Sequence, residues 1–177
     1  MVALCIVGAL SAVGYSSYFR QVQRTKVSRV QMELRTASQA IGSYFVDHNR
    51  FPEDPSNHGI LPSTLTTPIA YLGFGSIADP LAGTSRAGLE HDQNRLYRFW
   101  YVGDPEWLAQ QRPEEAEFFG IHHRNHGRWM VYARGPYGQG LEDIPGSGRR
   151  MMILYDPTNG IESVGRVFVS SRKAGWD

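Results

Sequence analysis

The first eighteen residues, MVALCIVGALSAVGYSSY, carry no charged side chain and are apolar on every face of a helix. At about 1.5 Å per residue, such a helix is roughly 27 Å long, slightly shorter than a hydrocarbon core of about 30 Å. Residues 1–18 are therefore predicted to form a transmembrane or filament-core helix, with a buried helix of a soluble protein as the alternative. A cleaved secretory signal is not favoured, because no Lys or Arg precedes the apolar run.

The pattern becomes amphipathic over residues 19–50. No proline occurs before Pro52, so one helix is predicted to run through both halves. Spacings of three and four place six apolar residues in one stripe along it: Val27, Val30, Leu34, Ala37, Ile41 and Tyr44. This stripe predicts packing against the rest of the chain. In the apolar half, Gly8 and Ala12 are small residues four apart, a spacing that lets helices approach closely but also occurs in ordinary membrane helices.

Residues 51–177 are predicted to form a soluble β domain. The connecting loop, 51–94, is rich in Pro, Gly, Ser and Thr. Short β-like runs bounded by turn residues predict four strands, at 96–102, 129–134, 151–155 and 164–170. Between the first two strands, 103–127 is longer than a hairpin needs and is interpreted as an insertion. The expected fold class is α+β, with the long N-terminal helix packed on a small antiparallel sheet.

The order of four sequence segments along the chain is informative. The segments are LRTASQAIGSYFVDHNRFP, LTTPIAYLGFGSIADP, RWMVYARGPYGQG and ILYDPTNGIESVGRVF. The first resembles a passage from helix to loop and the second a loop leading to an Asp-Pro turn, here Asp79-Pro80. The last two resemble strand–turn segments that close a small β domain. In this order the segments resemble the type IV pilin superfamily, specifically the major pseudopilins of type II secretion systems.

The resemblance implies a structural subunit without enzymatic activity. It would be stored in the inner membrane as a single-pass protein, in contact with membrane lipid and with its soluble domain in the periplasm. A secretion assembly platform would extract it, and it would join copies of itself and other pseudopilins in a periplasmic pseudopilus for type II protein secretion. Gly8, Ala12 and the Val27–Tyr44 stripe would then serve helix packing and assembly.

One feature differs from the family pattern, and a second conflicts with the topology that the resemblance implies. Such proteins carry a basic leader with a Gly-Phe cleavage site, which this sequence does not show, so we expect the helix to begin upstream of Met1. By the positive-inside rule alone, the basic residues of this helix would favour a cytoplasmic domain; they are Arg20, Arg24, Lys26, Arg29 and Arg35. The resemblance implies the opposite orientation. A solvated helical face is the simpler interpretation of these charges.

Net charge, cysteine content and the motifs that are missing argue against several kinds of function. The formal net charge is +1, with eighteen basic and seventeen acidic residues, so no nucleic-acid partner is expected. Cys5 is the only cysteine, so no disulfide forms within the chain. No G-x-S-x-G, G-x-x-x-x-G-K-[ST] or H-E-x-x-H motif is present, and no enzymatic activity is expected.

Metal binding remains open at two places. No cofactor is expected, but calcium, which major pseudopilins commonly bind, stays possible through oxygen donors at Glu142, Asp143, Asp156 and Asn159. Asp156 and Asn159 are equally explained by an Asp-Pro-Thr-Asn-Gly turn. A second candidate is the histidine cluster His122, His123 and His126, interpreted mainly as a polar loop because glycines flank it.

Two other functions stay open. The first is a minor pilin-like, membrane-anchored protein that binds DNA, a surface or a secreted substrate through the insertion at 103–127. The second is a membrane-anchored metal enzyme that uses the histidine cluster.

Overall fold

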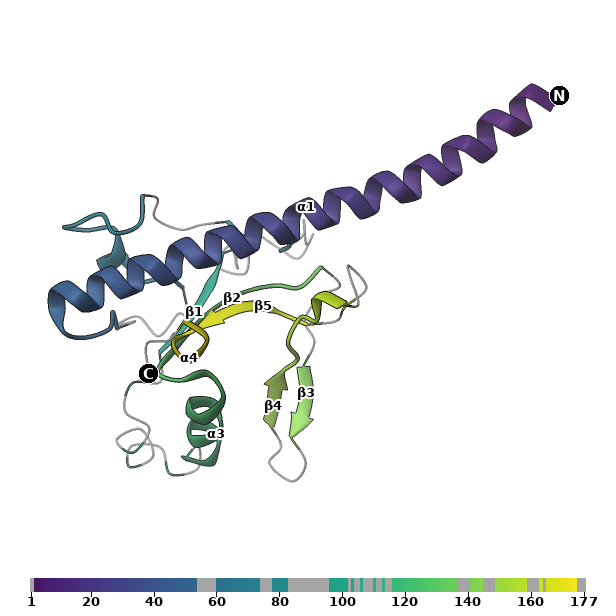
Figure 1. Cartoon of the computed structure of the whole chain (residues 1–177). Helices are drawn as coiled ribbons and strands as arrows, with labels where there is room; N and C mark the ends of the chain where they lie inside the picture. Colours follow the sequence, from purple (N-terminus) through teal and green to yellow (C-terminus); the bar gives the residue numbers. More distant parts are fainter. Residues whose placement is uncertain are drawn as a thin grey trace, which may run out of the picture.

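One long helix lies across a small antiparallel sheet in the computed structural model of the chain (Figure 1). The described part of the connecting segment between them includes the 3₁₀ turn η1 (Ser63–Leu65). The structure describes residues 2–53, 60–73, 78–82, 96–101, 103, 106, 110, 113, 116–136, 141–144, 149–158, 163 and 165–174.

The long helix, α1 (Val2–His48), has 47 residues. No proline interrupts its backbone hydrogen bonds. It ends at Asn49, whose φ of 51° is left-handed and whose N–H donates to the Phe45 carbonyl oxygen at 2.8 Å. α1 therefore runs without a break from Val2 to His48. In the part of the chain that the structure describes, no helix combines the length and the apolar character needed to cross a membrane.

The main sheet has three antiparallel strands in the order β1-β2-β5, namely β1 (Arg98–Tyr101), β2 (Trp129–Ala133) and β5 (Val167–Ser170). Val131 of the central strand lies opposite Phe99 on one side and Val169 on the other. Because side chains alternate between the faces of a strand, these residues share the face that packs on α1. The α+β class and the helix-on-sheet packing are confirmed.

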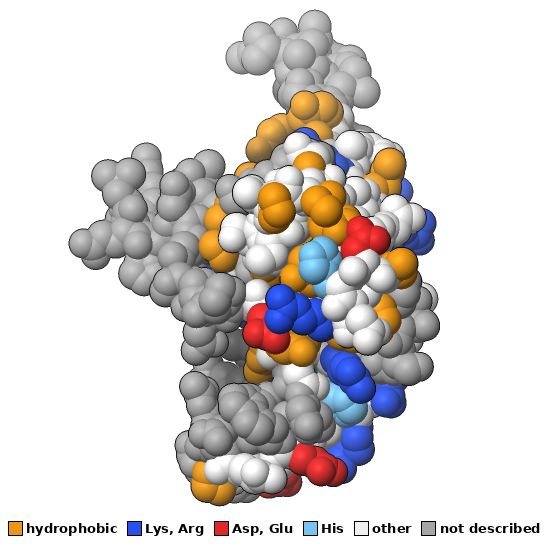
Figure 2. Space-filling model, turned by 90° about the vertical axis from the view of Figure 1, so that its left-hand side faces the viewer, with side chains coloured by type: hydrophobic (Ala, Val, Ile, Leu, Met, Phe, Trp, Pro, Cys, Tyr) orange, Lys and Arg blue, Asp and Glu red, His pale blue; other side chains and the backbone are white. Residues whose placement is uncertain are grey.

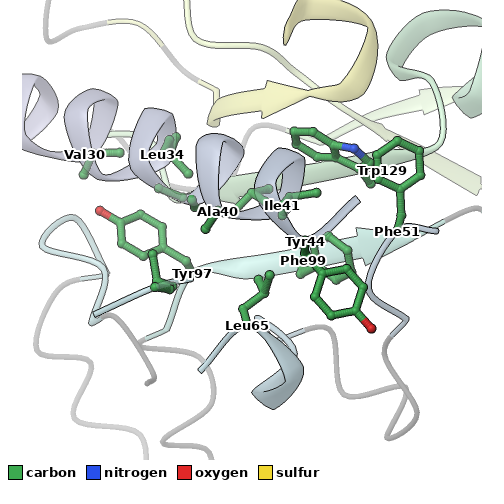
Figure 3. Close-up of a cluster of buried hydrophobic side chains, with 14 of the residues drawn as sticks. Val30, Leu34, Ala40, Ile41, Tyr44, Phe51, Leu65, Tyr97, Phe99 and Trp129 are labelled. Atoms are coloured by element: carbon green, nitrogen blue, oxygen red, sulfur yellow. The ribbon is translucent and has the colours of Figure 1, made fainter. Parts of the chain in front are cut away.

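The hydrophobic core lies between α1 and this face of the sheet (Figure 3). Trp129, at 0% exposure, is packed edge to face against Phe51 with ring centroids 6.4 Å apart. The connecting segment also contributes, since Leu65 and Leu72 are 0% and 1% exposed. This loop is thus held in place by two leucines inserted beside α1.

The prediction of a strand at 151–155 is wrong in its bounds and its pairing. β4 (Arg149–Met152) forms a separate two-stranded hairpin with β3 (Leu141–Ile144), a strand that the sequence did not predict. Leu154 makes only an isolated parallel bridge with Arg166. The close approach there depends on Gly165, whose φ is +141° and where a Cβ atom would lie 2.6 Å from the Leu154 carbonyl carbon.

The interpretation of the histidine cluster as a polar loop is also wrong. His122, His123 and His126 belong to α3 (Ala116–His126), which lies on the far side of the sheet from α1 (Figure 1). Gly120 is inside this helix, and Gly127 ends it with a φ of +78° and an N–H bond to the His123 carbonyl oxygen at 2.8 Å. Gly127 is therefore a helix stop signal and not evidence for a loop.

Candidate functional site

The segment of α1 that begins at Tyr15 presents large aromatic side chains to solvent. Tyr15 and Tyr18 are 74% and 70% exposed, and Phe19 is 51% exposed. About two helical turns after Phe19, the stripe begins with Val27, which is 5% exposed. The same helix thus changes from an open surface to a buried one within a few residues, where it reaches the domain (Figure 1).

Basic side chains follow the exposed aromatics along the helix. Arg20 and Arg24 are exposed and Lys26 is half-buried. At ~100° per residue, Lys26 lies about 160° around the helix from Arg24, so the cations are not confined to one face. No acidic residue precedes Glu33 in the sequence. Figure 2 views the molecule from the side at which α1 ends, where hydrophobic, basic and acidic side chains are intermixed on the surface.

A surface groove of about 450 Å³ follows this segment where α1 passes the Asp79-Pro80 turn. Pro80 forms one side, and the other consists of α1 residues Tyr18, Gln21, Val22, Thr25, Lys26 and Arg29. The lining combines a tyrosine ring, two cations and short polar side chains. Such a mixture suits a ligand with an anionic head and an apolar body.

The boundary between the open and buried parts of α1 is marked by Glu33. Its carboxylate accepts hydrogen bonds from Arg29 Nε at 2.8 Å and from Tyr97 Oη at 2.5 Å. Burial is the larger cause, and this hydrogen bond to a carboxylate the second, of a pKa of Tyr97 well above its usual value. The hydroxyl therefore stays protonated and continues to donate, which ties α1 to the residue just before β1.

Asp79 is a structural residue whose role the sequence did not reveal. Its carboxylate is 6% exposed and accepts the N–H of Arg134 at 2.6 Å and the N–H of Leu81 at 2.8 Å. The turn itself is present, since the Ala82 N–H donates to the Asp79 carbonyl oxygen at 3.0 Å. Burial raises the pKa of Asp79, against the two backbone hydrogen bonds that lower it. The residue fastens the connecting segment to the end of β2.

The histidines of α3 divide between the interior and the surface. His122 and His126 are each 6% exposed. The His122 ring lies 4.1 Å from the Trp100 ring, and the His126 ring lies 5.3 Å from that of Phe168, measured between centroids. Burial, with smaller contributions from His126 and His123, lowers the pKa of His122 to about 3. Burial also lowers the pKa of His126. Neutral imidazoles thus pack α3 on the sheet.

The oxygen donors proposed for calcium are placed only in part. Asp156 Oδ1 accepts the N–H of Thr158 at 2.8 Å and its hydroxyl at 2.6 Å, and these bonds lower the pKa of Asp156. This is the turn geometry that the sequence offered as the alternative. The side chains of Glu142 and Asp143, and all of Asn159, lie outside the described residues. Within those residues, no three His, Cys, Asp or Glu side chains gather as a metal site.

The residues predicted for helix packing fall into two groups. The stripe lies against the sheet and the connecting segment, with exposed fractions between 0 and 6%: Val27, Val30, Leu34, Ala37, Ile41 and Tyr44. Gly8 and Ala12 lie on α1, but their surroundings are outside what the structure describes. The stripe thus has its partner within the chain, whereas Tyr15, Tyr18 and Phe19 on the same helix are exposed to solvent.

Comparison with known proteins adds no further constraint. No protein-family model, no curated protein and no solved structure matches the chain.

Proposed function

We propose that the protein is a pilin-type structural subunit of a type II secretion pseudopilus. The N-terminal part of α1 holds it in the inner membrane as a single-pass protein, with the rest of the chain in the periplasm. An assembly platform then transfers it into a filament, where α1 packs against copies of itself and other pseudopilins. The subunit performs no catalysis.

One observation carries the proposal: α1 continues past its own domain and displays aromatic side chains there. Tyr15, Tyr18 and Phe19 are at least half exposed, whereas the stripe from Val27 onward is already buried within the chain. Burying an aromatic side chain of this size contributes about 1.5–3 kcal/mol. Three such residues on a projecting helix favour contact with lipid or with neighbouring subunits.

Site-specific photo-crosslinking tests the assembly. A benzoylphenylalanine at position 18 would lie on the projecting part of α1. The same side chain at Val46, which is 72% exposed near the other end of α1, is the matched control. We expect irradiation of the full chain in its native cells to give a ladder of homomultimers from position 18 and little from position 46.

Two outcomes would contradict the proposal. An absence of multimers from position 18, with the protein present at normal levels, would mean that copies do not meet through this part of α1. Equal ladders from both positions would reflect crowding and not a defined contact. Mass spectrometry of the crosslinked bands shows whether the partners are copies of this chain.

A further inference from the structure

We infer that residues 15–26 of α1 form an interfacial collar that binds the phosphate headgroups of anionic phospholipids. The collar consists of an aromatic tier, Tyr15, Tyr18 and Phe19, followed by a cationic tier, Arg20, Arg24 and Lys26. The inference rests on the membrane placement in the proposed function and adds a lipid class and the residues that select it.

The order of the tiers matches the layers of a bilayer. Aromatic side chains favour the boundary between hydrocarbon and headgroups, and Lys and Arg side chains reach outward to the phosphates. At ~1.5 Å per residue, the cationic tier extends about 9 Å along the helix. A headgroup layer is roughly 5–8 Å thick, slightly less than this span, and the long Lys and Arg side chains can bridge the difference.

The arrangement around the helix favours an upright helix over one that lies flat. A helix lying on a membrane gathers its cations on one face and its apolar residues on the other. Here Arg20 and Arg24 are on one side, while Lys26 is on another, in the groove beside Pro80. Headgroups surrounding an upright helix would meet a cation on either side.

The distribution of charged residues along the chain also fits a membrane surface at the collar. Four of the eighteen Lys and Arg residues, and none of the seventeen Asp and Glu residues, precede Glu33. The remainder of the chain has fourteen Lys and Arg residues against seventeen Asp and Glu residues, a formal excess of three acidic residues. Within the described residues, the ion pair of this region uses Arg29 with Glu33, not the cationic tier. Arg20, Arg24 and Lys26 are the cations nearest the aromatic tier.

Competition between two vesicle populations tests the collar. The purified full chain is diluted from detergent into equal amounts of phosphatidylcholine vesicles and vesicles with 30 mol% phosphatidylglycerol, distinguished by fluorescent lipids. Near an anionic surface, three cations together favour binding on the order of 100-fold. We expect a strong preference for the anionic vesicles at 0.1 M salt, greatly reduced at 1 M salt, where the screening length is about 3 Å.

Two variants assign the effect to the collar. The triple variant Arg20→Gln, Arg24→Gln, Lys26→Gln should distribute evenly between the vesicles. The control triple variant Arg35→Gln, Arg50→Gln, Arg128→Gln removes the same charge from exposed positions elsewhere and should keep the wild-type preference. Circular dichroism confirms that both remain folded.

The outcomes separate this inference from the proposed function. A wild-type chain that binds both vesicles equally would overturn the collar but leave the membrane placement standing. A wild-type chain that binds neither vesicle population would overturn both the collar and the membrane placement. A preference for anionic vesicles that survives in the collar variant, or is lost in the control, would also overturn the assignment to these residues.

Discussion

The two parts of α1 are one continuous helix but have opposite surroundings. From Val27 to Tyr44, every residue of the stripe is buried against the sheet and the connecting segment. From Tyr15 to Phe19, comparably large side chains are exposed, and the cations Arg20, Arg24 and Lys26 follow them along the helix. Hydrophobic content therefore does not by itself indicate what a helix packs on. The spacing does, since an unbroken stripe of threes and fours marks the part that belongs to the domain.

The largest effect should come from a cavity in the buried part. Replacing Ile41, which is 0% exposed, by Ala should lower the free energy of unfolding by about 2–5 kcal/mol. Met32 is 68% exposed on the same helix, and Met32→Ala should change the value by less than about 0.5 kcal/mol. Urea unfolding of the purified full chain provides both numbers. Similar losses for the two variants would break the distinction between the faces of α1.

A pH-dependent effect should come next, from the other side of the sheet. His122 is neutral when folded, with a pKa of about 3, and regains its ordinary pKa near 6.5 on unfolding. The unfolded chain therefore binds a proton that the folded chain does not, and stability falls as the pH drops below about 6.5. Between pH 7 and pH 5, the loss from this residue should be about 2 kcal/mol.

His122→Phe isolates this contribution, because it retains a ring beside Trp100 without a titrating group. We expect a shallower decline of stability between pH 7 and pH 5 than in the parent chain. His48→Gln, which removes an exposed histidine without touching α3, is the matched control. A decline that is the same in His122→Phe as in the parent chain would show that α3 is not held by a neutral histidine.

The buried part of the molecule was predicted most successfully where local spacing decides the structure. The stripe follows from spacings of three and four, and β1, β2 and β5 follow from short β-like runs bounded by turn residues. The extension of α3 through His122–His126 was missed because Gly120 and Gly127 were given the same meaning, although one lies inside the helix and the other stops it at positive φ. Its capping position could have been recognised, since Gly follows the last helical residue.

Contacts between distant residues could not be predicted in this way. Asp79 accepts a hydrogen bond from Arg134, 55 residues away, and no local pattern links the two positions. The β3–β4 hairpin was missed because LEDI and RRMM carry charges where a regular alternation would be the signal. The exposure of Tyr15 and Tyr18 likewise depends on how far the sheet reaches along α1, which is a property of the folded domain.

A smaller effect is expected at the boundary between the two parts of α1. Tyr97→Phe removes the hydroxyl that donates to Glu33 and should lower the free energy of unfolding by about 1–2 kcal/mol. Tyr71→Phe is the matched control, because Tyr71 also donates to a carboxylate, Asp47, at 2.7 Å, but at an exposed site. Equal losses in the two variants would mean that burial of the Tyr97–Glu33 pair adds nothing.

The smallest effect on stability should come from the exposed part of α1. This prediction separates the exposed part from the buried part most clearly. Tyr18→Ser should change the free energy of unfolding by less than about 0.5 kcal/mol, since Tyr18 is 70% exposed. The same substitution should nevertheless weaken multimer formation, which can be followed with the photo-reactive side chain placed at position 15. A loss of stability above about 1 kcal/mol would show that Tyr18 serves the domain. Unchanged stability with reduced crosslinking would assign the side chain to a partner outside the subunit, because a residue that its own fold does not need then contributes only to assembly.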